Sequence, residues 1–300
     1  MKGVLLVNLG TPSAPTTAAV RRYLAEFLSD PRVIPLPRFV WLPILHGIVL
    51  RTRPAKSAEK YKLIWTPLGS PLAVHTARQT ELVRPLLRDC RVEYAMRYGA
   101  PSIAAGLEKL KACQPVTVVP LYPQYSVSAT QTALDLVPGL RAVRDFHDHP
   151  GYIAALASTV RKYWEVNGRG EKLLMSFHGL PRRGAGEYET QCRSTGALLA
   201  ESLQLGQDRW LVTFQSRFGF AKWLEPYTQP TLEALAQQGV ARVDVVCPGF
   251  VSDCLETLEE IGITARAAFV AAGGKELRMI PCLNEAPEWI GALAQIAAST

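Results

Sequence analysis

Apolar residues follow two alternating patterns along this chain, and together they predict a repeating order of strands and helices. Short apolar runs typical of buried strands occur at Gly3–Leu9, Arg91–Met96, Val116–Pro120, Lys172–Phe177, Arg209–Phe214 and Arg242–Cys247. Helical spacing of apolar residues occurs between them, at Thr17–Leu28, Thr76–Leu87, Ser102–Cys113, Tyr152–Glu165, Tyr188–Leu203 and Thr231–Gln238. This alternation favours an α/β fold with parallel sheets and right-handed crossovers.

The two halves of the chain also resemble each other weakly. Three matches recur in the same order: Val4–Gly10 with Leu173–Gly179, Met96–Gly99 with Ser216–Gly219, and Val118–Ser126 with Val245–Ser252. We therefore expect two similar Rossmann-like domains, residues 1–150 and 151–300, each a parallel sheet flanked by helices. A ligand cleft is expected between them, and the last helix is expected to pack back on the N-terminal domain.

The first half is longer than the second because of an insertion at about residues 36–70. It begins with an apolar segment, residues 36–50, which is too short to cross a membrane and is interrupted by Pro43 and Gly47. Five cations follow: Arg51, Arg53, Lys56, Lys60 and Lys62. We call residues 36–50 the lip. Two interpretations remain open: a buried core helix, or an amphipathic surface that lines an apolar pocket or rests on an anionic membrane.

The composition is that of an ordinary globular protein, but the charge is not balanced. Of 300 residues, 48% are hydrophobic and 20% charged, and the net charge is +7. An anionic small molecule or membrane surface suits this charge, whereas no nucleic-acid-binding signature is present. The six cysteines form no C-x-x-C pair, and no signal peptide follows Met1, so we expect a cytoplasmic protein.

Residues with side chains suited to binding or catalysis lie where the predicted strands end. These are Asn8–Pro12, Arg97, Tyr98, Tyr122, Tyr125, His178, Gln215–Arg217, Asp253 and Glu256. Ligands of open α/β sheets bind beyond the carboxyl ends of the strands, so we expect these residues to form one site.

The segment after the last predicted strand carries three acids. A helix that opens at Ser252 would place Asp253, Glu256 and Glu260 on one face. Such a row suits a dication or proton transfer, but acids in a first helical turn are also ordinary caps. His178 has the same ambiguity, because an imidazole at a strand end is either structural or a proton acceptor and metal ligand.

Several longer motifs closely resemble ferrochelatase, and the resemblance extends from about Lys2 to Ala298. The motifs are Asn8–Pro12, Gly69–Leu72, Leu121–Ser126, Ser176–Pro181, Phe214–Gly219, Lys222–Thr228 and Cys247–Ile261. The sequences of these motifs are most similar to those of the proteobacterial, protoporphyrin-using branch of the family. The resemblance implies a lyase that inserts Fe(II), its substrate, into protoporphyrin IX in the terminal step of haem synthesis, with release of two protons.

The resemblance also implies roles for individual residues. His178 and Glu256 would be the catalytic, metal-site pair, and Asp253 and Glu260 would extend an acidic path. Phe39, Trp41 and Leu42 of the lip would face the porphyrin ring. The other positions that match the family's porphyrin pocket are Arg53, Ser70, Arg97, Tyr98, Tyr122, Tyr125, Tyr188 and Trp223.

The sequence departs from the family pattern at three places. Leu68 replaces a glycine before Gly69, Cys254 replaces a histidine of some relatives, and only Cys282 lies near the C-terminus. We therefore expect no iron–sulfur cluster and no tightly bound cofactor. The alternatives are a coproporphyrin III ferrochelatase, a cobalt chelatase, a porphyrin or haem carrier without turnover, and a two-domain binder of a small anion.

Overall fold

The computed structural model describes residues 1–219 and 221–299, and the chain divides into two compact units. The N-terminal unit comprises Met1–Asp145 and the chain from Leu293, and the C-terminal unit comprises Phe146–Ala292. The boundary falls inside the last helix, α12 (Pro287–Ala298).

The N-terminal unit is built on a parallel sheet with strand order β2-β1-β3-β4. The strands are β1 (Lys2–Gly10), β2 (Cys90–Tyr98), β3 (Val116–Pro120) and β4 (Arg141–Ala142). One face is covered by α5 (Ile103–Lys109) and α6 (Thr132–Leu134) through an apolar core, and α4 (Pro71–Val83) packs against β2 and β1. The sheet confirms the predicted parallel α/β fold; β4 was missed because it is only two residues long.

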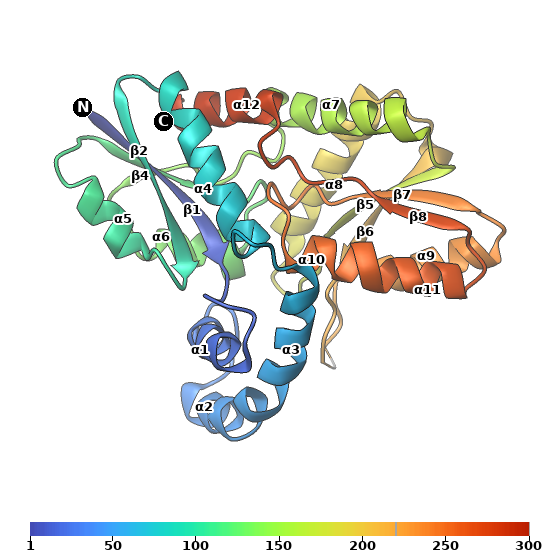
Figure 1. The fold of residues 1–300 in the computed structure, drawn as a ribbon, viewed down its shortest axis with the longest axis horizontal. Helices are drawn as coiled ribbons and strands as arrows, with labels where there is room; N and C mark the ends of the chain where they lie inside the picture. The colour runs from blue at the N-terminus through green and yellow to red at the C-terminus, as the bar shows by residue number, and fades with distance from the viewer. Residues whose placement is uncertain (220, 300) are drawn as a thin grey trace. The chain divides into compact units, whose positions relative to one another are not determined.

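The insertion forms one continuous, bent run of helix beyond the carboxyl end of β1 (Figure 1). It includes α2 (Arg38–Ile44), a π-helical turn (Leu45–Val49) and α3 (Leu50–Ile64), which packs against α1 (Thr17–Leu28). The α2 helix has no buried residue, and the side chains of Phe39 and Ile48 are 81% and 61% exposed. The lip is therefore a surface element of its unit, which excludes the core-helix interpretation for α2.

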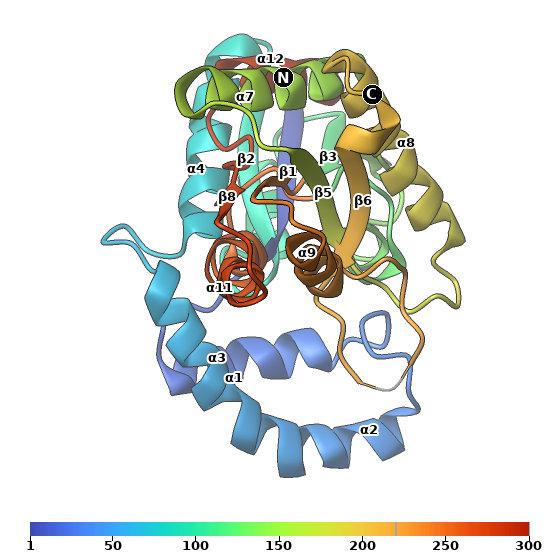
Figure 2. The same cartoon turned by 90° about the vertical axis from the view of Figure 1, so that its right-hand side faces the viewer.

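The C-terminal unit has a parallel sheet of order β6-β5-β7-β8. Its strands are β5 (Lys172–His178), β6 (Trp210–Gln215), β7 (Arg242–Val246) and β8 (Glu276–Met279). Two helices, α9 (Thr228–Gln237) and α11 (Arg266–Ala271), lie side by side on one face and share its apolar core (Figure 2). The remaining helices are α7 (Pro150–Asn167), α8 (Gly186–Ser202) and the short α10 (Leu255–Leu258).

Strand register supports the internal repeat residue by residue. Leu5 pairs with Val118 in the first sheet as Leu174 pairs with Val245 in the second. This is the match seen in the sequence. The match of Met96 with Ser216 is wrong by two residues, because Val4 pairs with Val92 and Leu173 with Trp210, which makes Phe214 the counterpart of Met96. Each counterpart makes the same loop contact: the Met96 amide donates to the Pro101 carbonyl and the Phe214 amide to the Pro226 carbonyl.

A buried carboxylate on β7 binds donors from the edge strand β8 and from two segments that precede β5. Asp244, on β7, is fully buried and accepts hydrogen bonds from Trp164 Nε1 (2.6 Å), the Gly170 amide (2.8 Å) and Arg278 Nε (2.7 Å). The carboxylate and its hydrogen bonds raise the pKa of the Arg278 guanidinium. Because a buried charge is tolerated only when it is paired, these donors are what permits an acid in the strand.

We predict that Asp244→Ala lowers the free energy of unfolding by about 3–5 kcal/mol, because it leaves Arg278 and two other donors without their acceptor. Urea unfolding followed by circular dichroism measures the change. Asp208→Asn, at an exposed position, is the control and should shift the midpoint little. A change below about 1 kcal/mol in Asp244→Ala would contradict a stabilising role for the pair.

Candidate functional site

His178 is the last residue of β5, and three contacts fix its orientation. It pairs in register with Gln215 on β6, and its carbonyl accepts a hydrogen bond from Tyr188 Oη at 2.9 Å. Its ring Nδ1 lies 2.7 Å from the Gly179 carbonyl oxygen. A carbonyl can only accept, so Nδ1 carries the proton and Nε2 of the neutral ring has a free lone pair. His178 is therefore a proton acceptor or metal ligand through Nε2.

The side chain of Gln215 is buried, and its amide has a defined direction. Oε1 accepts from Ser176 Oγ (2.6 Å) and lies 3.8 Å from the Cys247 thiol. Nε2 therefore points the other way and donates to the Glu256 carbonyl oxygen at 2.7 Å. This amide joins the end of β6 to the backbone of α10.

Glu260 opens a π-helical turn (Glu260–Ala265), and its carboxylate is held on both oxygens. The Ser216 amide donates to Oε1 and Ser216 Oγ donates to Oε2, both at 2.6 Å, and Gln215 Nε2 lies 3.4 Å from Oε2. Burial raises the pKa of Glu260, although the Ser216 hydroxyl and nearby His178 act in the opposite direction. Glu260 is thus within electrostatic reach of both His178 and Glu256.

The expectation that Asp253 shares a helical face with the other two acids is wrong. The helix begins at Leu255 rather than Ser252, with Cys254 as its N-cap. Asp253 is buried ahead of it and accepts hydrogen bonds from Thr257 Oγ1 (2.9 Å) and Asn284 Nδ2 (2.6 Å). Its carboxylate thus anchors the β7–α10 loop to the segment around Asn284. Glu256 lies in the first turn of α10, where its carboxylate interacts with the Cys254 thiol.

Trp223 and Tyr188 support the segment that carries His178. The backbone of Trp223 pairs with Pro181, its ring is buried, and its indole Nε1 has no hydrogen-bond partner in the described part of the chain. Tyr188 is buried as well, and burial raises its phenol pKa well above the ordinary value. Both residues were predicted as porphyrin contacts; within their own unit, they hold the His178 loop in place.

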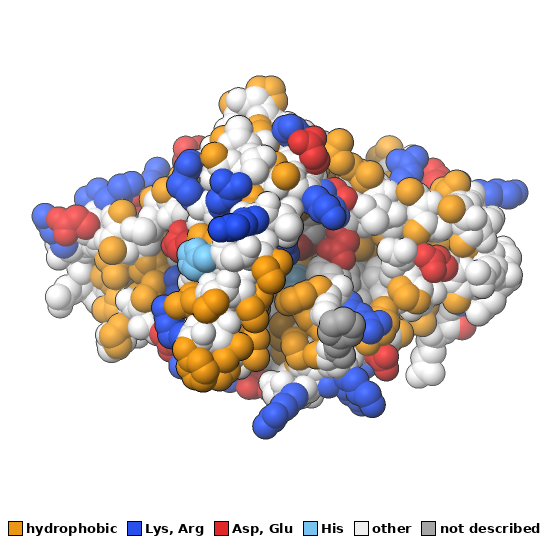
Figure 3. All heavy atoms as spheres, turned by 90° about the horizontal axis from the view of Figure 1, so that it is seen from below, with side chains coloured by type: hydrophobic (Ala, Val, Ile, Leu, Met, Phe, Trp, Pro, Cys, Tyr) orange, Lys and Arg blue, Asp and Glu red, His pale blue; other side chains and the backbone are white. Residues whose placement is uncertain are grey.

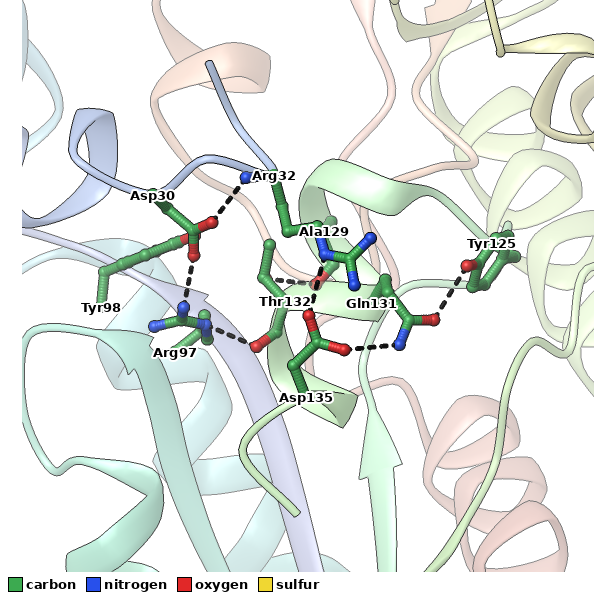
Figure 4. A network of polar contacts seen from close by, with 9 residues as sticks. All are labelled: Asp30, Arg32, Arg97, Tyr98, Tyr125, Ala129, Gln131, Thr132 and Asp135. Atoms are coloured by element: carbon green, nitrogen blue, oxygen red, sulfur yellow. Dashed lines mark hydrogen bonds and ion pairs between the residues drawn. The ribbon is translucent and has the colours of Figure 1, made fainter. Parts of the chain in front are cut away.

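Arg97 and Tyr98, also predicted as porphyrin contacts, bind a buried acid of their own unit (Figure 4). The Arg97 guanidinium forms an ion pair with Asp30 and donates through Nε to the Thr132 carbonyl at 2.7 Å. Tyr98 Oη donates to Asp30 at 2.9 Å, and burial raises the pKa of Tyr98. The charge of Arg97 is thus already compensated before any ligand arrives.

Tyr125 belongs to a second branch of this polar network (Figure 4). Its hydroxyl donates to Gln131 Oε1 at 2.9 Å, Gln131 Nε2 donates to Asp135 at 2.8 Å, and Asp135 pairs with Arg32. These contacts lower the pKa of Asp135. The two branches fasten the loop that follows α1, which leads into the lip, to β2 and α6.

Three further predicted residues differ in exposure. The hydroxyl of Tyr122 is buried and has no hydrogen-bond partner among the described residues, and burial raises its pKa well above the ordinary value. Ser70 is buried at the start of α4, where its Oγ accepts from Thr11 Oγ1 at 2.8 Å. Arg53 is exposed on α3. Of the two predicted cations, Arg97 and Arg53, Arg53 is thus the exposed one.

The replacement of a glycine by Leu68 leaves the loop before α4 intact. The left-handed φ of +120° falls on Gly69, and Leu68 lies outside the positive-φ region. Thr66 and Gly69 exchange two backbone hydrogen bonds of 3.0 Å that close the turn. The single remaining glycine supplies all the conformational freedom that this turn requires.

Three residues that shape these regions were given no individual role from the sequence: Gln215, Ser216 and Asp30. Gln215 and Ser216 lie in the motif Phe214–Gly219 at the end of β6, and that position was the available signal. Asp30 carried none, since it lies in a loop far from Arg97 in the chain. Across residues 1–219 and 221–299, no three His, Cys, Asp or Glu side chains are placed to hold a metal ion together.

A family model described as Ferrochelatase matches residues 1–300. Curated proteins named Ferrochelatase align over nearly the whole chain. The protein of Azoarcus sp. strain BH72 is 59% identical, with 97% of this chain and 85% of the relative covered. That of Aromatoleum aromaticum is 55% identical, with 99% and 87% covered, and that of Bordetella pertussis 54%, with 98% and 86% covered.

Solved structures of low sequence identity share the two-domain fold. One is CbiX, described as the terminal enzyme of sirohaem biosynthesis in denitrifying bacteria, at TM-score 0.54 and 16% identity, covering 100% of this chain and 99% of that one. Another is SirB from Bacillus subtilis, at TM-score 0.53 and 12% identity, covering 100% and 95%. At these identities, the likeness concerns the fold alone.

The raised pKa of Glu260 predicts a pH-dependent stability difference. Its protonated form is favoured in the folded state, so its contribution to stability is present below the ordinary glutamate pKa of about 4.3 and is lost as pH rises through the folded-state pKa. Wild type should therefore lose stability relative to Glu260→Gln as pH rises from about 4 to 7. Unfolding curves across this range test it. The exposed Glu201→Gln should retain the wild-type profile, and a constant difference between wild type and Glu260→Gln would contradict the prediction.

Proposed function

Because the chain belongs to the ferrochelatase family, a family of metal chelatases of haem biosynthesis, we propose that it inserts Fe(II) into protoporphyrin IX to give protohaem. Two pyrrole N–H protons leave as the metal enters the ring. The reaction therefore needs a group that accepts protons, a group that presents a dication, and a surface for a flat apolar ring. The observation that carries the assignment is the fixed tautomer of His178, whose ring lies within electrostatic reach of Glu260.

His178 is the proton acceptor in this proposal. Its Nδ1 hydrogen bond to the Gly179 carbonyl leaves Nε2 as the basic atom, and Tyr188 holds the backbone of the same residue. After Nε2 takes a pyrrole proton, the imidazolium retains its hydrogen bond to Gly179 and is stabilised by the nearby Glu260 carboxylate. The pair thus favours proton removal without rearrangement of the strand end.

Glu256 is the carboxylate that presents the metal. A carboxylate and an imidazole are both ordinary ligands of Fe(II), and a dication attracts pyrrole nitrogens as their protons leave. Glu260, with both oxygens bound by Ser216, serves in proton removal rather than as a ligand. Asp253 has its oxygens occupied by Thr257 and Asn284 and supports the loop.

The charges favour a porphyrin with two carboxylates over one with four. The ion pair of Arg97 with Asp30 removes one of the two predicted cations, so exposed Arg53, with Arg51 and Lys56 beside it on α3, would meet the propionates. Coproporphyrin III carries twice as many carboxylates and would need more open cations. Tyr122 and Tyr125 follow β3 and supply aromatic surface.

We further propose that the enzyme carries no resident iron–sulfur cluster. Cluster ligands are thiolates, whereas burial and the neighbouring Asp253 raise the pKa of the Cys282 thiol well above its ordinary value. Cys247 and Cys254 are buried nearby, with raised pKa values for the same reason.

The lip suits peripheral contact with an anionic membrane surface. No helix in the described residues is both long and apolar enough to span a bilayer. Apolar side chains gather over the lip, with Lys and Arg side chains beside them (Figure 3). The exposed apolar residues are Leu36, Phe39, Val40, Ile44 and Ile48. An apolar surface bordered by cations combines the two terms that bind interfacial helices, apolar burial and attraction to anionic lipid.

Loss of the proton acceptor or the metal ligand should abolish most turnover. In anaerobic assays with Fe(II) and protoporphyrin IX, we expect His178→Ala and Glu256→Gln each to lower kcat by about 10²–10⁴-fold. Absorbance of the metalated product gives the rate. Glu201→Gln, on the exposed face of α8, is the matched control and should retain wild-type kcat.

Three outcomes of the same assay would change the assignment. Turnover of both variants at the wild-type rate would refute the roles of His178 and Glu256. If wild type failed to insert Fe(II), Zn(II) or Co(II) but bound the ring, the porphyrin-carrier alternative would replace the chelatase. Faster turnover of coproporphyrin III than of protoporphyrin IX would identify the other branch of the family.

The membrane contact predicts that polar substitutions on the lip weaken vesicle binding. Phe39→Ser and Ile48→Ser should each weaken binding to vesicles rich in phosphatidylglycerol about tenfold, because each removes an apolar side chain from the interface. Co-sedimentation measures the effect. Leu86→Ser, a comparably exposed leucine outside the lip, is the control. Equal binding by all three variants would contradict docking through the lip.

A further inference from the structure

Ser216 donates two hydrogen bonds to the carboxylate of Glu260, where one would be enough to join the loop to the helix. Its backbone amide and hydroxyl reach different oxygens of the same carboxylate, both at 2.6 Å. Ser216 does so from a left-handed backbone conformation, with φ of 64°, which side-chain-bearing residues seldom adopt. The conformation turns two donors of one residue toward one acid.

Gln215 reinforces the hold on Glu260. Its Nε2 lies 3.4 Å from Glu260 Oε2 and donates to the Glu256 carbonyl at 2.7 Å. The amide cannot reverse, because the Glu256 carbonyl can only accept a hydrogen bond and therefore requires Nε2 opposite it. Thr228, Ser176 and Thr213 form a buried hydrogen-bonded chain behind it, so the support is rigid.

Without this hold, Glu260 would be a third ligand for the incoming metal. Glu256 and Glu260 are four residues apart, a separation that places side chains on the same side of a helix. The carboxylate of Glu260 is also within electrostatic reach of His178. Three such protein ligands form the retentive sites in which enzymes keep a resident zinc ion. An enzyme that transfers its metal to a porphyrin must instead bind the metal weakly enough to release it.

We propose that Ser216 is a positioning residue that withholds Glu260 from the metal, so that His178 and Glu256 alone present the dication and release it to the ring. Donors on both oxygens of Glu260 fix its orientation and compete with a metal for its lone pairs, whereas Oε1, which has one donor, keeps a lone pair that can accept a proton. The inference rests on the proposed metal insertion, but it concerns affinity for metal and is testable without a porphyrin.

Ser216→Gly is the variant that isolates the hydroxyl. Glycine adopts φ of 64° without cost and keeps the backbone amide, so the fold and one of the two short hydrogen bonds survive. A hydrogen bond to a charged group contributes roughly tenfold to an equilibrium constant. We therefore expect Ser216→Gly to bind Zn(II), a redox-inert probe, about tenfold more tightly than wild type in competition with a chromophoric chelator.

The same variant should divide the kinetic constants in a way that a loss of structure would not. With Zn(II) as the varied substrate, KM for the metal should fall and kcat should fall with it, because a retained ion leaves more slowly. The double variant Ser216→Gly with Glu260→Gln should return to wild-type Zn(II) affinity, since the third ligand is gone. Gln204→Gly, which relaxes another left-handed residue (φ of 54°) of the same unit, is the control and should not change Zn(II) affinity.

Zn(II) affinity of Ser216→Gly at or below the wild-type value, in protein with wild-type unfolding curves, would overturn the proposal. Tighter binding that persists in the double variant would overturn it as well, because Glu260 would then not be the added ligand. Failure of the proposed function is separate: wild type would then not insert metal into a porphyrin, whatever the Zn(II) affinities.

Discussion

The buried side-chain amide of Gln215 can take only one orientation without leaving polar groups unpaired. The Glu256 carbonyl can only accept, so Nε2 must face it, and Oε1 then faces the Ser176 hydroxyl. Reversal would place Oε1 against this carbonyl, and an unmet buried group costs about 1–3 kcal/mol. This single constraint fixes α10 to the end of β6, beside His178 at the end of β5. The positions of Glu256 and Glu260 follow from it.

The duplicated N-terminal unit uses the same backbone position for a different purpose. By strand register, Arg97 is the counterpart of Gln215, and it donates to the Thr132 carbonyl as Gln215 donates to that of Glu256. A guanidinium in this partly buried position needs an anion, and Asp30 provides it from the loop that leads to the lip. The scaffold contact is conserved between the halves, whereas the charges around it have diverged.

Two acids of the segment after β7 show how carboxylates close in the sequence acquire different surroundings. Asp253 and Glu260 both have donors on each oxygen, but those of Asp253 come from Thr257 and Asn284 and serve the loop, whereas those of Glu260 come from Ser216 at the end of β6. Glu256 interacts with a weakly donating thiol instead. The availability of a carboxylate for chemistry is thus set by its donors more than by its place in the sequence.

The sequence by itself determined the fold class, six of the eight strands and the duplication, because apolar periodicity and repeated motifs are local properties of the chain. The sequence also predicts His178, Glu256 and Glu260 as site residues, through motifs at the strand ends and through the family they resemble. Two short strands, β4 and β8, escaped because so few residues carry no clear pattern.

Tertiary structure decided what each side chain does. Asp253 left the acidic row because Asn284 meets it from another loop, and Arg97 lost its open charge to Asp30, 67 residues away. Contacts of this kind join segments far apart in the sequence, so their energies depend on the packing of whole elements rather than on local pattern. This dependence on packing is the physical reason why the residues could be predicted from the sequence, whereas their partners could be seen only in the folded chain.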